Sequence, residues 1–231
     1  MRFVHHREAL LNLAKKVAHE LHISIETEVV VAHRTSDGIL AAAERHKATA
    51  LVIGWKGFTN ARDRIFGEIA DQVIRYAPCD LMVLKIEGDG PLKRCFLPTA
   101  GGPNARLAAD LLNTMAGENG MEVTAGYVIT EDHREFSEGE IEDRLNQTLS
   151  SVNKAAKTSR KVILANSVAG GIAKASRDFD LVVIGAAKEP FFRKMLFGEI
   201  PEKVARFSPT SVLVVKKYEG VVKSVLKKVI G

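Results

Sequence analysis

The stretch GWKGFTNARDRIFGEIADQVIRYAPCDLMVLK, residues 54–85, is the most informative part of the chain because the chain contains it twice. Residues 185–216 read GAAKEPFFRKMLFGEIPEKVARFSPTSVLVVK and align with it without a gap. The aligned identities include Gly54 with Gly185, Phe66 with Phe197, Gly67-Glu68-Ile69 with Gly198-Glu199-Ile200, Arg75 with Arg206 and Pro78 with Pro209. Such agreement does not arise by chance, so the chain holds two copies of one structural unit.

The second copy alternates apolar strand patterns with helical ones. Strands are predicted at 93–98, 121–129, 161–165, 181–184 and 211–215, and helices at 105–116, 138–157, after Gly170-Gly171 and from Gly198. The run at 181–184 is apolar throughout, which is typical of a strand covered on both faces. The alternation predicts an α/β fold with crossover connections, a parallel sheet and helices on both faces.

The first copy starts late. Its predicted helices are 4–21, 39–46 and 67–76, and its predicted strands are 25–32, 50–53 and 81–86. Matched to the second copy, Met1 falls near Asp132, so the equivalents of the first strand, first helix and second strand are missing, on the order of 40 residues. The strand at 25–32 then has no neighbour, and we expect it to be displaced, exposed or paired with another element or chain.

The predicted domains are an incomplete unit at 1–88, a complete unit at 92–218 and an amphipathic C-terminal helix at 219–231. The helix has lysines on one face, so it could lie on an acidic membrane surface, on its own domain or on a partner subunit. No stretch approaches the ~20 apolar residues of a membrane span, which favours a soluble cytoplasmic protein. The charge of +5 is spread along the chain without a basic, aromatic-containing block, so a nucleic-acid partner is not expected.

The pattern Gly54-x-x-Gly57-x9-Gly67 lies between a strand and a helix and is followed by Ala77-Pro78-Cys79-Asp80 and a final strand. In this context it resembles the signature of the universal stress protein family. The resemblance implies tandem Rossmann-like domains of the adenine-nucleotide alpha hydrolase type, with five-stranded parallel sheets in the order 3-2-1-4-5. It also implies a homo-oligomer formed through the last strands.

The amino-acid sequence of both glycine loops also resembles that of the paired domains at the cytoplasmic C-terminus of prokaryotic amino-acid permeases and chloride-channel-type transporters. This second resemblance implies a membrane transporter as partner and a place at the cytoplasmic face of a membrane. It also implies that the 231 residues are the tail of a longer chain.

The glycine loops carry the candidate nucleotide site, because glycines let backbone approach a phosphate and a helix N-terminus attracts it. Many members of the family bind ATP and others do not, so ATP or another adenine nucleotide is the implied cofactor. The candidate residues are Gly54, Gly57, Gly67, Glu68, Thr99, Gly101, Gly185, Lys188, Gly198 and Glu199.

Several of these residues depart from the ATP-binding pattern. Glu68 and Glu199 stand where ATP-binding members have Ser or Thr, and a carboxylate there occupies the anion site itself. Lys188 replaces the second glycine and could pair with a phosphate or with Glu199. Thr99 begins a turn where the family has an acidic residue. We therefore expect weak binding, and the alternative is that the glycines serve loop geometry alone.

No catalytic or metal-binding pattern stands out in the chain. His19 and His22 are three residues apart on a helix, but no cysteine or carboxylate at metal-ligand spacing accompanies them, so no metal is predicted. A nucleophile elbow, a phosphate-binding Walker loop and a catalytic triad are all missing from the sequence. The expected function is a regulatory or stress-response module that senses an adenine nucleotide and is not an enzyme. The alternative is a ligand-free structural assembly domain.

Overall fold

The computed structural model describes residues 2–56, 66–131, 136–152, 156–187 and 196–220. In the first copy these residues form α1 (Arg2–Glu20), α2 (Thr35–Arg45), β1 (Ala50–Gly54), α3 (Glu68–Tyr76) and β2 (Asp80–Lys85). In the second copy they form β3 (Arg94–Pro98), α4 (Pro103–Asn119), β4 (Glu122–Ile129), α5 (Glu138–Ser150), β5 (Thr158–Leu164), α6 (Val168–Ala175), β6 (Leu181–Gly185), α7 (Glu199–Phe207) and β7 (Ser211–Lys216), with a short 3-10 turn at Ser176–Asp178. The predicted C-terminal helix lies almost wholly outside the described residues.

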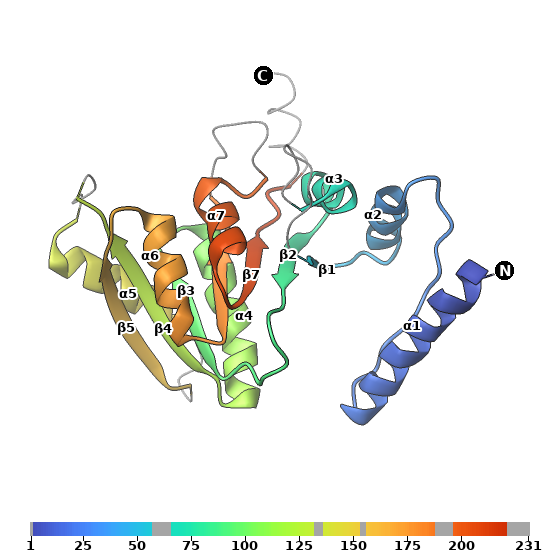
Figure 1. Cartoon of the computed structure of the whole chain (residues 1–231), viewed down its shortest axis with the longest axis horizontal. Helices are drawn as coiled ribbons and strands as arrows, with labels where there is room; N and C mark the ends of the chain where they lie inside the picture. Colours follow the sequence, from blue (N-terminus) through green and yellow to red (C-terminus); the bar gives the residue numbers. More distant parts are fainter. Residues whose placement is uncertain (1, 57–65, 132–135, 153–155, 188–195, 221–231) are drawn as a thin grey trace, which may run out of the picture.

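The strands form one sheet instead of the two that the repeat predicts. Its seven strands have the order β1-β2-β7-β6-β3-β4-β5, and every neighbouring pair is parallel except β2 with β7. Within the second copy this is the expected order 3-2-1-4-5, which is confirmed. The tandem parallel sheets expected for the two copies are continuous with each other, because their last strands pair (Figure 1).

The junction between the copies has approximate two-fold symmetry. Its strand register places Val83 opposite Val214, which are equivalent residues of the repeat. The rings of Phe66 and Phe197, another equivalent pair, meet edge to face with centroids 5.3 Å apart. Both rings are buried. The two copies therefore meet through the same surface, as subunits do in an isologous dimer.

Polar contacts at the junction are reciprocal as well. The backbone N–H of Glu87 donates to Ser211 Oγ (3.1 Å), and at the equivalent positions that of Tyr218 donates to Asp80 Oδ1 (2.7 Å). The buried Lys85 donates from Nζ to the carbonyl of Ser208 (2.6 Å), at the end of α7. Strand pairing inside the chain uses both edges of β2 and of β7, so these last strands have no free edge through which the predicted homo-oligomer could pair.

Helices cover the two faces of the sheet unequally. In the second copy α4 and α5 pack on one face and α6 and α7 on the other, and α2 and α3 continue the second layer over β1 and β2. On β1, Leu51 and Ile53 contact that layer, whereas Val52 faces the opposite side and is 58% exposed. The bare face is where the first copy lacks its counterpart of α4.

The remaining part of the first copy is largely uncovered. Residues 23–32 form no strand, so the strand predicted at 25–32 is wrong, whereas its expected exposure is confirmed, with Val31 93% exposed. Its counterpart β5 pairs with β4, and the first copy has no equivalent of β4. Figure 1 shows α1 lying apart from the sheet, and its apolar Leu10 and Leu13 are exposed.

The two edges of the sheet differ in how they discourage pairing with another chain. The β5 edge carries charge, because Arg160 and Lys161 form exposed ion pairs with Glu142 and Asp178. The β1 edge reads Ala-Leu-Val-Ile-Gly and carries neither charge nor proline. Native edges are normally blunted by charge, proline or cover, so the β1 edge is prone to pair with another strand.

Replacing Val52 by Lys is therefore expected to reduce concentration-dependent self-association of the chain, measured by light scattering, with little change in thermal unfolding. The matched control is Val162→Lys on β5, where the side chain is 52% exposed and cations on the strand already discourage pairing with another chain. Equal effects of the two substitutions, or a chain that stays monomeric at all concentrations, would contradict this interpretation.

Candidate functional site

The strands β3 and β6 separate at their carboxyl ends. They are paired only through Cys95 with Leu181 and Phe96 with Val182, although both strands continue beyond these residues. Crossovers from these two strands run in opposite directions, which makes this the point where open α/β sheets bind ligands. The region where β3 and β6 separate, called here the β3–β6 crevice, is the candidate site.

One side of the β3–β6 crevice is the turn from Thr99 to the start of α4. The Thr99 hydroxyl is buried, lies 3.1 Å from Thr148 Oγ1 and accepts the Gly101 N–H (3.0 Å). Gly101 and Gly102 have φ of 85° and 97°, a region that favours glycine. Thr99 therefore shapes the turn and has little hydroxyl capacity left for a ligand.

Asn104 connects the two sides of the crevice. Its buried side chain donates from Nδ2 to the Ala186 carbonyl (2.8 Å), and its Oδ1 accepts the Lys217 N–H (2.8 Å). A Cβ at Gly185 would lie 2.7 Å from the backbone carbon of Asn104, so only glycine lets α4 approach β6 this closely. A Cβ at Gly54, its equivalent, would meet nothing within 4 Å, because the first copy lacks α4.

The other side of the crevice is the start of α7. Gly198 precedes it with φ of 93°, and a Cβ there would lie 2.4 Å from Ala187 Cβ. The exposed Glu199 carboxylate pairs with Lys203, one turn along the same helix. Pro201 has no N–H, which removes one of the donors that a helix start offers to an anion. Tight phosphate binding at α7 is therefore disfavoured.

Glu202 supplies an internal anion at this helix start, and it was not among the residues predicted from the sequence. Its side chain is 4% exposed, and Oε1 accepts the N–H groups of Leu196 (2.5 Å) and Phe197 (3.0 Å). Burial raises the pKa of the Glu202 carboxyl, opposed by these two N–H groups. The equivalent residue of the first copy is Asp71, also a carboxylate, and this repeated acid was the available signal.

Arg144 brings a cation to the Thr99–Gly102 side of the crevice. Its Nη1 donates to the Ala100 carbonyl (3.0 Å), and its guanidinium lies 4.0 Å from the centroid of the Phe136 ring. The residue projects from α5, and the sequence pattern gave no reason to select it. Its position suits contact with a phosphate at the turn.

The predicted site residues fall into two groups. Thr99, Gly101, Gly185, Gly198 and Glu199 lie around the β3–β6 crevice, whereas Gly54, Gly67 and Glu68 belong to the first copy, which has no second side to its crevice. Gly57 and Lys188 lie outside the described residues, so the pairing expected for Lys188 has no structural account. In the described ranges no three His, Cys, Asp or Glu side chains are grouped as a metal site requires. None of the helices in these ranges is long and apolar enough to span a membrane.

Comparisons with known proteins place both copies in one family. The sequence model of the universal stress protein family matches residues 3–85 and 91–216. The Na(+)/H(+) antiporter NhaS5 of Synechocystis sp. is 23% identical over 202 residues, which are 86% of this chain and 29% of that protein. Universal stress protein MJ0531 of Methanocaldococcus jannaschii is 33% identical over 75 residues, 32% of this chain and 44% of that protein. The matches thus span less than half of either curated relative.

Solved structures agree on the fold. A universal stress protein from Archaeoglobus fulgidus aligns with a TM-score of 0.63 at 16% identity, covering 93% of this chain and 80% of that one. One from Pseudomonas aeruginosa, named a putative universal stress protein, aligns with a TM-score of 0.58 at 16% identity, covering 92% and 78%.

Glu202→Ala is expected to lower the free energy of unfolding by about 2 kcal/mol, since two buried N–H groups lose their acceptor. Glu202→Gln keeps an acceptor oxygen and is expected to cost less. The two variants also differ in pH dependence. The unfolded Glu202 carboxyl has its pKa near 4.5 and the folded carboxyl has a higher pKa, so the native state binds the proton more tightly than the unfolded state does. The stability of the native chain therefore falls as the pH rises from the unfolded pKa through the folded pKa.

Urea unfolding at a series of pH values measures this difference. The Gln variant does not titrate at this position, so it should lack the fall, and its stability should gain on that of the native chain as pH rises. Glu199→Gln, on the exposed side of the same helix, is the control and should follow the native curve. Parallel curves for the native chain and Glu202→Gln would contradict the role given to Glu202.

Proposed function

Because the chain belongs to the universal stress protein family, we propose that it is a stress-response regulatory module whose second copy senses an adenine nucleotide without turning it over. One observation carries the proposal, namely the separation of β3 and β6 at the switch point of a complete second copy. A nucleotide would place its phosphates against the Gly101-Gly102 turn, beside Arg144 and the start of α4.

The same site favours weak and reversible binding. The loop N–H groups at α7 already bond to Glu202, and Pro103 and Pro201 remove donors from the starts of α4 and α7. Glu199 adds a negative charge, which Lys203 offsets. A sensor needs a dissociation constant near the cellular concentration of its ligand. These features lower the affinity and are therefore compatible with sensing.

The lack of turnover is part of the proposal. In the described part of the crevice the buried hydroxyl of Thr99 is engaged by Thr148 and Gly101, and no histidine adjoins it. A nucleophile or a general base needs a partner that activates or orients it. Binding would act by differential affinity for two conformations of the module.

Calorimetric titration of the chain with ATP is expected to give a dissociation constant weaker than about 10 µM. Arg144→Glu should weaken binding about tenfold or more, because it replaces a charge-assisted donor by a repelling charge. Arg160→Glu makes the same charge change on β5, away from the crevice, and should leave affinity unchanged. Nanomolar binding by the native chain, or no loss in Arg144→Glu, would overturn the assigned site.

A transporter is the proposed setting of the module. The supporting observation is that 86% of the chain matches a part of a Na(+)/H(+) antiporter that makes up 29% of that protein. In such a protein the nucleotide-bound module would bias the conformation of the membrane part. A permease or a chloride-channel-type transporter is equally compatible with the proposal as the membrane part that carries the module.

Sequencing of the coding DNA around the 231 residues tests this setting. The proposal expects several apolar segments of about 20 residues in the same reading frame. A complete frame without such segments would contradict the transporter setting and leave the proposed nucleotide site unaffected.

A further inference from the structure

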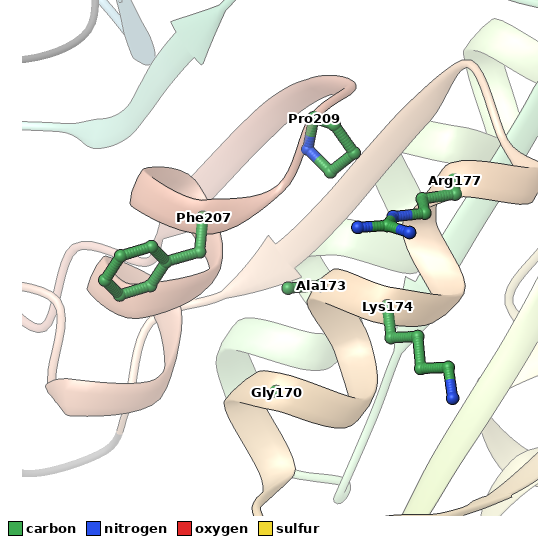
Figure 2. Close-up of a pocket in the computed structure, with 6 residues that line it drawn as sticks. All are labelled: Gly170, Ala173, Lys174, Arg177, Phe207 and Pro209. Atoms are coloured by element: carbon green, nitrogen blue, oxygen red, sulfur yellow. The ribbon is translucent and has the colours of Figure 1, made fainter.

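A hollow of about 470 Å³ lies between α6 and the end of α7, and no part of the proposed nucleotide site adjoins it. Its lining residues are Gly170, Ala173, Lys174, Arg177, Phe207 and Pro209 (Figure 2). Arg177 precedes β6 and Pro209 precedes β7, so the hollow extends toward the amino edge of the sheet, opposite the β3–β6 crevice. We call it the α6–α7 groove.

The internal repeat shows that the groove is specific to the second copy. Gly38 and Gly171 align the two copies here, because an added Cβ would lie 3.2 Å from Ala32 Cβ in one copy and 2.9 Å from its equivalent Ala165 Cβ in the other. On this alignment Ala173 stands where the first copy has Leu40, which packs against the core. Gly170 likewise stands where the first copy has an aspartate. The smaller side chains of the second copy therefore leave the space that forms the groove.

The charge at the groove has diverged in the same way. Lys174 and Arg177 stand where the first copy has Ala41 and Glu44, so the pair changes from −1 to +2, a difference of 3. Both cations are exposed, and neither has an ion-pair partner within the described residues. The nearby acid Asp178 is held by Lys161 at 3.1 Å. The groove therefore presents uncompensated positive charge.

An apolar wall completes the groove. Phe207 is 59% exposed, and Pro209 lies beside it at the end of α7. Figure 2 shows Arg177, in the short turn after α6, extending toward Pro209, with Ala173 on the side of α6 nearer α7 and Lys174 extending from α6 away from Phe207. An exposed ring next to unpaired cations is the combination that recognises acidic and apolar side chains together.

We propose that the α6–α7 groove binds an acidic peptide segment of a partner protein, in which carboxylates alternate with large apolar side chains. The carboxylates pair with Lys174 and Arg177, and an apolar side chain enters over Ala173 against Phe207. A small phosphate ligand fits less well, because the cations are spread along one rim and the Gly170 N–H, at the start of α6, already donates to Ser167 Oγ (3.2 Å). The partner is recognised by charge and apolar contact together.

The test measures fluorescence anisotropy of a labelled peptide in which Glu alternates with Leu and Phe, titrated with the whole chain. Binding is expected, with weakening as salt is raised. Lys174→Glu combined with Arg177→Glu should weaken it about tenfold or more. The charge-matched control, Lys15→Glu with Lys93→Glu, changes two exposed cations elsewhere and should bind like the native chain. Thermal unfolding confirms that each variant remains folded.

A second variant separates shape from charge. Ala173→Leu restores the residue type of the first copy and should abolish binding while every charge is kept. Equal binding by the double charge variant, equal loss in the charge-matched control, or equal binding of a peptide with Gln for Glu would overturn the proposal. Displacement by inorganic phosphate, or tighter binding to phosphatidylserine vesicles that the double charge variant loses, would assign the groove to phosphate groups and overturn it as well.

Discussion

The antiparallel pairing of β2 with β7 is the contact on which the rest of the structure depends. Within the described residues the first copy contributes β1 and β2 to the sheet, and two strands are marginally stable by themselves in water. Joined to β7 they become the edge of a seven-stranded sheet. The edge-to-face contact of Phe66 with Phe197 and the buried Lys85 fix the geometry of that junction. The first copy is therefore held in place by the second.

The two copies have diverged in what they can do. The second copy keeps the strands on both sides of the switch point, so its glycines border a crevice that Asn104 spans. The first copy keeps the same glycines, but Gly54 has no helix to accommodate and the bare side of β1 faces away from the core. The second copy also gained a cationic groove between α6 and α7. The proposed binding functions thus lie in the second copy, and the first completes the sheet.

Much of the fold followed from pattern, whereas the candidate site was predicted only in outline. Apolar runs located every strand of the second copy, and the aligned glycine loops identified the repeat. Residues 25–32 have strand composition and no strand, because a strand exists only when a neighbour supplies hydrogen bonds. Glycine spacing located the site loops, but Asn104 joins segments 82 and 113 residues away, and the buried carboxylate of Glu202 turns back onto the preceding loop. The sequence carries no signal for the Asn104 contacts, and the acid repeated at Asp71 and Glu202 marks a residue without showing which loop it bonds.

Local pattern was sufficient to establish the repeat and the α/β class, because periodicity and glycine spacing are properties of short segments. The strand order of the second copy was implied by the resemblance to the family. Tertiary structure alone decided that the two copies share one sheet, that Gly185 serves the close approach of α4, that Glu202 is an internal anion, and that a positive groove lies between α6 and α7. These features depend on which surfaces meet in space. Burial and hydrogen-bond partnership belong to such pairs of surfaces and to no single stretch of chain.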